Sequence, residues 1–126
     1  SVLLEVADHA GVAKAMQNMD AGIFIIKPAY SKIASAPTKL GEFLGCGVPC
    51  LGNANVGDIA DIIVGEKVGV VLSSFDADSI RVAVEELVCL TKQEGIKAHC
   101  RDVALRYFSL KEGVRSFDRI YRELVV

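Results

Sequence analysis

A loop of small residues that leads into a helix holds the side chains best suited to chemistry in this 126-residue chain. Residues 31–38 contain Ser, Ala, Pro and Thr, whose small side chains let a ligand approach the backbone closely. The N-terminus of the following helix offers free N–H groups and a partial positive charge, which suit a phosphate. Lys39 stands in the first helical turn, where a cation opposes the helix dipole unless an anion is bound there. The segment therefore predicts a phosphate site.

Glu42 lies about one turn further along the same predicted helix. A carboxylate at that position can accept two hydrogen bonds from a ribose diol while a diphosphate lies at the helix end. The ligand indicated by the two positions together is a nucleotide. The alternative stays open, because loops of Ser, Ala and Pro begin many helices that bind nothing, and Glu42 would then be an ordinary exposed residue.

The elements that must position this segment alternate along the chain. Apolar runs predict four strands, at residues 2–6, 22–26, 48–51 and 68–72. The strand at 22–26 is almost entirely apolar and should be covered on both faces. Helical spacing predicts helices at residues 8–19, 39–46, 58–64, 76–94, 96–107 and 109–124. Short connections between such elements predict a parallel, Rossmann-like α/β layer. The ligand site should then lie beyond the carboxyl ends of the strands, at the loops after Ile26 and Leu51.

Caps and inward faces follow from the same periodicity. Asp8 and Asp76 are expected N-caps, and the Ser109–Glu112 pattern predicts a capping box. The helix that begins at residue 39 should bury Leu40, Phe43 and Leu44, and the helix from residue 76 should turn inward its residues Ile80, Val84, Leu87 and Val88. The last helix is expected to place on one apolar face Val114, Phe117, Ile120, Tyr121 and Leu124. We expect this face to be part of the core or a docking surface.

Charge and composition exclude several classes of function. The net charge is −2 and Lys and Arg alternate with acids, so we expect no nucleic-acid partner. Apolar runs are far shorter than the roughly 18–20 residues of a membrane span, so none is expected. Hydrophobic residues nevertheless make up 52% of the chain, with a mean hydropathy of +0.38. This excess favours buried parallel strands or a surface that meets more protein.

The four cysteines, Cys46, Cys50, Cys89 and Cys100, form no C-x-x-C pair, and the chain has only two histidines. We therefore expect four small buried side chains in a reducing cytoplasm, with no metal site and no cofactor.

Residues 37–49 resemble the C-terminal-domain signature of retaining GT-B glycosyltransferases, the group 1 glycosyl transferase family. Other segments resemble further family motifs in the same order, at residues 19–23, 55–63, 69–72 and 107–121. The similarity implies that residues 1–126 form one partial nucleotide-sugar-binding domain, the incomplete second half of a GT-B C-terminal domain. In the family's strand order, 3-2-1-4-5-6, the chain would begin at strand 4, which leaves residues 2–6 as an unpaired edge strand. We expect that strand to meet either the missing N-terminal domain or another copy in a homodimer.

The resemblance also implies a function. The complete protein would transfer a sugar, with retention and without a metal, from a nucleotide-diphospho-sugar donor. Glu42 matches the Glu that holds the donor ribose, and the small turn that meets the diphosphate and sugar corresponds to Ser35, Ala36 and Thr38. Lys39 completes the expected donor site.

Two departures from the family pattern limit this expectation. Ala34 stands eight residues before Glu42, where the family has a Glu that faces the donor sugar. Pro37 replaces a Gly of the turn and removes one N–H donor. No residue is therefore predicted to be catalytic, and the chain alone should be inactive. The alternative is a stand-alone, non-catalytic nucleotide-binding or dimerisation module. A response regulator or a dehydrogenase is disfavoured because their acidic cluster and G-x-G-x-x-G motif are missing.

Overall fold

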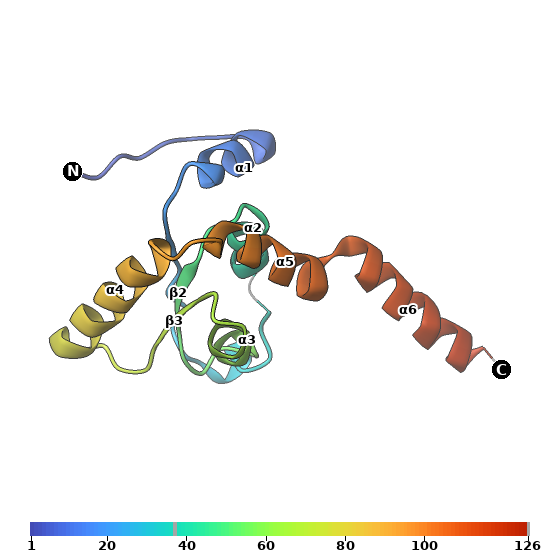
Figure 1. Ribbon diagram of the computed structural model, residues 1–126. Coiled ribbons are helices and arrows are strands. Elements are labelled where there is room, and N and C mark those ends of the chain that lie inside the picture. The colour runs from blue at the N-terminus through green and yellow to red at the C-terminus, as the bar shows by residue number, and fades with distance from the viewer. Residues whose placement is uncertain (37, 126) are drawn as a thin grey trace.

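A computed structural model describes residues 1–36 and 38–125. Its centre is a parallel sheet of three strands, β1 (Gly22–Ile23), β2 (Cys50–Asn53) and β3 (Gly69–Leu72), in the order β1-β2-β3 (Figure 1). Gly22 lies opposite Cys50, and Cys50 lies opposite Gly69. The mixed α/β class with parallel strands and flanking helices is therefore confirmed.

The helices are α1 (His9–Gln17), α2 (Thr38–Gly45), α3 (Ile59–Gly65), α4 (Ala77–Thr91), α5 (Ile96–Phe108) and α6 (Leu110–Leu124), with a short 3₁₀ turn η1 (Tyr30–Lys32). Two predicted caps are confirmed: Asp8 accepts from the Gly11 N–H at 2.7 Å and Asp76 from the Ser79 N–H at 2.9 Å. Among the helices of the described residues, from α1 to α6, none combines the length and the apolar character that crossing a bilayer demands.

The predicted capping box at the start of α6 does not form. Among the described residues the Ser109 side chain makes no cap hydrogen bond, although Ser109 does precede the helix. Glu112 instead accepts a hydrogen bond from Arg115 at 2.6 Å, one turn along the helix. The Glu112 carboxylate is held by a charged partner, which is a stronger acceptor–donor combination than a neutral backbone N–H.

The main core lies between the sheet and the helices α2, α3 and α5. Leu40, Phe43 and Leu44 of α2 are buried as predicted, and α5 adds Cys100 and Val103. A smaller core on the other sheet face joins α4 to β2 and β3 through Leu51, Leu72, Ala83 and Leu87. Figure 1 shows α4 on one side of the strands and α3 and α5 on the other. The sheet is thus fully covered on both faces at β2 and partly covered at β3.

The predicted double coverage of strand 22–26 is wrong. Only Gly22–Ile23 forms the ladder, and Ile23 and Ile25 are 61% and 49% exposed. The reason is the position of α4, which packs on β3 and β2 and leaves the same face of β1 open. The inward orientation predicted for Ile80, Val84 and Val88 of α4 is wrong for the same reason, and of that predicted set only Leu87 is buried.

The predicted strand at residues 2–6 is also wrong. These residues are irregular, and Val2 and Val6 are almost completely exposed. Figure 1 shows the segment extended away from the sheet, before α1. A strand needs a neighbour to satisfy its backbone N–H and C=O groups, and the three described strands pair with one another instead. The sheet therefore has three strands in this structure rather than four.

The cysteines follow the prediction only in part. Cys50 and Cys100 are completely buried, and burial raises the pKa of the Cys50 thiol and raises that of Cys100 to about 11. Such thiols stay protonated and behave as small hydrophobic groups. Cys46 is partly buried, and Cys89 is exposed on α4, so the prediction that all four are buried is wrong.

Candidate functional site

A hollow opens beyond the carboxyl ends of β1 and β2, where a parallel α/β sheet places its ligands. Its volume is about 650 Å³, within the range of small-molecule sites. Two loops form its walls: the one after β1 contributes Pro28, Ala29 and Ile33, and the one after β2 contributes Ala54, Asn55 and Gly57. We call this hollow the crevice. It lies at the two loops that the sequence predicted as the site.

Asn53 ties these two loops together at the base of the crevice. The side chain is 2% exposed, and its Oδ1 accepts from the Ile26 N–H at 2.8 Å. Its Nδ2 donates to the Ile26 carbonyl at 2.7 Å and to the Ala54 carbonyl at 3.3 Å. The amide thus takes the place of a neighbouring strand, because it pairs with both backbone groups of Ile26 after the β1 ladder has ended. The sequence prediction placed Asn53 in a loop and missed this role.

The walls of the crevice meet where Ser35 approaches Gly57. Gly57 has a φ of +49°, in the left-handed region that favours glycine. A Cβ atom at this position would overlap the Ser35 carbonyl oxygen. The predicted site residue Ser35 therefore packs directly against the loop after β2.

The remaining predicted site residues lie at the start of α2. Ala36 is exposed before the helix, and Thr38 is its exposed first residue. The Lys39 ammonium donates to Glu42 Oε2 at 2.8 Å, and both side chains are more than a third exposed. The structure thus brings Lys39 and Glu42 together on one face of α2. Pro37, which replaces the family's Gly, lies outside the described residues.

Glu42 faces a second, smaller hollow between α1 and α2. This hollow has a volume of about 140 Å³ and is lined by His9, Met16, Glu42 and Cys46, among others. Ser35 lies against the crevice loop, whereas Glu42 lines this second hollow from the second half of α2. The predicted residues therefore do not surround one cavity.

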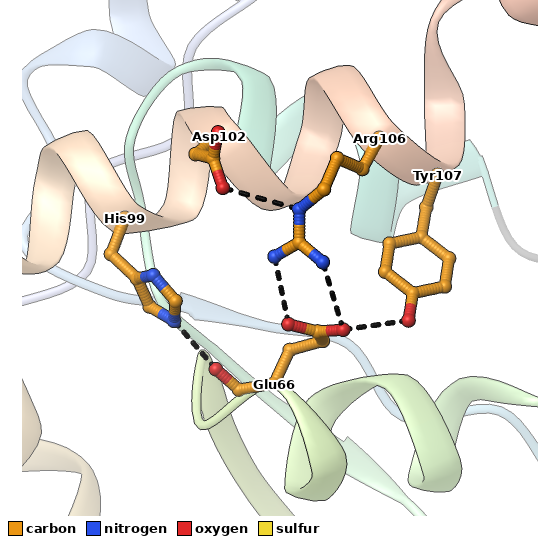
Figure 2. A network of polar contacts seen from close by, with 5 residues as sticks. All are labelled: Glu66, His99, Asp102, Arg106 and Tyr107. Atoms are coloured by element: carbon orange, nitrogen blue, oxygen red, sulfur yellow. Dashed lines mark hydrogen bonds and ion pairs between the residues drawn. The ribbon is translucent and has the colours of Figure 1, made fainter.

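A separate polar network lies at Glu66 (Figure 2). Arg106 of α5 donates to both Glu66 carboxylate oxygens at 3.2 and 2.8 Å, and the Tyr107 hydroxyl donates to Glu66 Oε1 at 2.6 Å. His99 Nε2 donates to the Glu66 carbonyl at 2.6 Å, and Asp102 accepts from Arg106 Nε at 3.1 Å. Glu66 follows α3 and precedes β3, so the network lies at the amino end of that strand, away from the crevice. It clamps α5 to α3.

The Glu66 network makes stability depend on pH in acid. The hydrogen bonds from Arg106 and then from Tyr107 lower the pKa of Glu66 from 4.5 to about 2. A lowered pKa in the folded state means that the stabilisation is complete above pH 4.5 and is lost as the pH falls toward 2. We expect the Tm of Glu66→Gln to lie below that of the wild type at neutral pH, with the difference closing over this window.

Thermal melts of both proteins, followed by circular dichroism across this pH range, measure the difference directly. Glu85→Gln is the matched control, because Glu85 forms a single exposed ion pair with Arg81 and should barely change the Tm. A Tm difference for Glu66→Gln that stays constant with pH would mean that the clamp does not depend on the ionised carboxylate.

Compared with models of known protein families, with curated proteins and with solved structures, the chain matches none of them. Within the described part of the chain, no group of three or more His, Cys, Asp or Glu side chains is arranged to hold a metal ion. The fold and the site define an α/β protein with a three-stranded parallel sheet and a crevice at the carboxyl ends of its strands. Function has to be inferred from that geometry.

Proposed function

We propose that this chain is the donor-binding part of a retaining GT-B glycosyltransferase and binds a nucleotide-diphospho-sugar at the N-terminus of α2. The observation that carries the proposal is that the segment before α2 packs on the loop after β2, with Ser35 against Gly57, while Lys39 and Glu42 lie together on α2. The free N–H groups at the N-terminus of such a helix suit a diphosphate.

Each part of the donor then has a place. The diphosphate lies at the backbone of Ser35, Ala36 and Thr38, with the Lys39 ammonium beside it. The ribose diol donates to the Glu42 carboxylate, and the base extends into the hollow beside His9 between α1 and α2. The donor sugar enters the crevice. Lys39 and Glu42 are paired with each other in this structure. The ligand would give Lys39 a phosphate of opposite charge and would give Glu42 two ribose hydroxyl donors.

This chain would bind the donor and stabilise the leaving diphosphate through the helix dipole and Lys39, without a metal. The acceptor and the groups that act on it would come from another part of the complete protein, and the chain alone would be inactive. A non-catalytic nucleotide-binding module is the second proposal. It is favoured by Ala34, which places a methyl group where the family pattern has a carboxylate facing the sugar.

The test is an NMR titration of the chain with UDP, GDP and ADP. We expect amide shifts that cluster on residues 35–42 and at His9, with at least one of the three ligands at millimolar concentration. Glu42→Ala should weaken that ligand about 10- to 100-fold, because hydrogen bonds to a charged acceptor contribute about 1.5–3 kcal/mol.

Glu85→Ala is the matched control, since Glu85 is also paired with a cation on an exposed helix face but lies on α4. It should leave the affinity unchanged. Shifts that survive in Glu42→Ala would remove the ribose role, and the absence of shifts with all three nucleotides would remove donor binding altogether. Shifts confined to residues 35–42 with no sugar-dependent change in the crevice, when UDP-glucose is compared with UDP, would favour the non-catalytic module.

A further inference from the structure

The walls of the crevice are almost entirely apolar. Among the described residues that line it, Asn55 has the only polar side chain, and the others are Pro28, Ala29, Ile33, Ala54, Gly57 and Ala60. Ile33 is 60% exposed, so its side chain is open to contact with a ligand. Apolar walls with one polar group are typical of sites that orient a small molecule through few polar contacts. The crevice therefore suits a ligand group that is itself mostly apolar and carries one polar function.

Asn55 presents its amide at this wall from a left-handed backbone. Its φ is +64°, a conformation that Asn adopts more readily than most residues other than glycine. Its side chain is exposed, whereas the amide of Asn53, two residues earlier, is buried and bonded to the backbone of Ile26 and Ala54. The Asn55 amide is thus open to a ligand, with Oδ1 as an acceptor and Nδ2 as a donor.

The proposed donor site decides which part of the donor would reach this amide. Ser35, where the diphosphate is proposed to bind, packs on Gly57, and Gly57 lies two residues from Asn55 on the same wall. Glu42, the proposed ribose ligand, instead lines the hollow between α1 and α2. The nucleoside and the crevice therefore lie at different places along the donor. The group next to Asn55 would be the sugar.

We propose that the donor sugar is an N-acetylated amino sugar, and that Asn55 and Ile33 recognise its acetamido group. This group has one N–H donor, one carbonyl acceptor and one methyl group. The Asn55 amide offers the complementary acceptor and donor, and the methyl group is removed from water against Ile33 and Ala29. An unmodified hexose would place a hydroxyl group against the same apolar side chains. The inference rests on the proposed function and deepens it by naming the class of sugar.

An acidic sugar is the competing class. Lys27 and Lys32 immediately precede the wall residues Pro28 and Ile33 in the chain, and either ammonium group could pair with a sugar carboxylate. Both lysines are exposed, however, and neither belongs to the lining of the crevice. Because an exposed ion pair contributes little in water, the apolar lining and the Asn55 amide favour the acetamido group.

NMR titrations of the full chain with UDP, UDP-N-acetylglucosamine, UDP-glucose and UDP-glucuronate test the inference. We expect UDP-N-acetylglucosamine to bind roughly tenfold more tightly than UDP-glucose, as one net hydrogen bond and one buried methyl group together provide. UDP-glucuronate should bind no more tightly than UDP-glucose. Asn55→Gly keeps the left-handed backbone and removes the amide, so it should reduce the preference to about threefold or less and leave the Kd of UDP unchanged. Ile33→Ala should reduce the preference too, through the lost methyl contact.

Asn18→Gly is the matched control, because it removes an exposed amide at the end of α1, outside the crevice, and should change none of the four affinities. UDP binding without a preference for the acetamido sugar, or with a preference that persists in Asn55→Gly, overturns the inference and leaves the proposed function standing. Tightest binding of UDP-glucuronate overturns it in favour of the lysines, and binding of GDP or ADP without any of the UDP series overturns it as well. If UDP, GDP and ADP all fail to bind, the proposed function itself falls, and the inference falls with it.

Discussion

Replacing Asn53 with alanine should lower the free energy of unfolding by about 2–6 kcal/mol, because two backbone groups of Ile26 lose their partner. The Ile26 N–H and C=O are both paired with the Asn53 amide, at 2.8 and 2.7 Å, at a partly buried point beyond the β1 ladder. Each such group costs about 1–3 kcal/mol when it is left unpaired away from water. Denaturant unfolding, followed by circular dichroism, measures the change.

Asn53→Asp tests the acceptor role of the Asn53 amide oxygen separately from the donor role of its amide nitrogen. The carboxylate can still accept from the Ile26 N–H but, when ionised, it repels the Ile26 and Ala54 carbonyl oxygens and carries a charge at a 2% exposed position. At neutral pH it should therefore destabilise at least as much as Asn53→Ala. Its deficit should shrink in acid, where the protonated carboxyl can donate. Asn18→Ala, at the exposed end of α1, is the control and should cost less than about 0.5 kcal/mol. An Asn53→Ala protein as stable as the wild type would mean that the amide does not hold the two loops.

Local sequence patterns predicted most of the helices and the parallel sheet. The Asp8 and Asp76 caps, the buried Leu40–Leu44 stripe and the break at Gly95, whose φ is +78°, each depend on a few neighbouring residues. Strand 48–51 was predicted two residues early. It runs from Cys50 to Asn53 because those residues lie opposite Gly69–Leu72 of β3, a register that periodicity within one segment cannot specify.

The errors arose where coverage depends on distant elements. An apolar run such as residues 2–6 predicts a strand only if another strand lies beside it, and hydropathy carries no information about the neighbour. Likewise Ile80, Val84 and Val88 are apolar at helical spacing, but whether they are buried depends on where α4 lies across the sheet. It lies over β2 and β3, and these three side chains extend toward an uncovered β1. Sequence periodicity therefore identified the apolar faces correctly but could not tell which of them the chain itself covers.

The candidate site was predictable in the same uneven way. Lys39 and Glu42 are three residues apart on one helix, so their approach follows from helix geometry. The division of the site into a crevice and a separate Glu42 hollow depends on α1, which packs on the far side of α2 from the crevice loops. The Glu66 clamp joins residues 40 positions apart and had no sequence signal. For Asn53 the sequence did carry a signal, which the prediction missed. A single amide side chain at the end of an apolar strand is expected to be buried with its hydrogen-bonding groups all paired.

Gly57→Ala should destabilise the protein by about 2–5 kcal/mol and disturb the crevice as well. A residue with a side chain at φ +49° costs about 1–2 kcal/mol, and the added methyl group overlaps the Ser35 carbonyl oxygen. Relieving such an overlap in a packed region costs a further 1–3 kcal/mol or so, because a carbonyl of the main chain can move only with its neighbours. The loop that carries Ser35 and Ala36 should therefore shift away from the loop after β2.

Gly65→Ala is the matched control. Gly65 ends α3 eight residues later, and a Cβ atom there has nothing within 4 Å, so the substitution should be neutral or stabilise by up to about 1 kcal/mol. Chemical denaturation of both variants gives the stability change, and amide shifts at residues 34–36 report the movement of the loop. A Gly57→Ala protein with wild-type stability and unshifted amides at these residues would mean that Ser35 does not pack on Gly57. The crevice would then lack the wall that brings the predicted phosphate-binding turn to the ends of β1 and β2, and the case for a donor site there would fall with it.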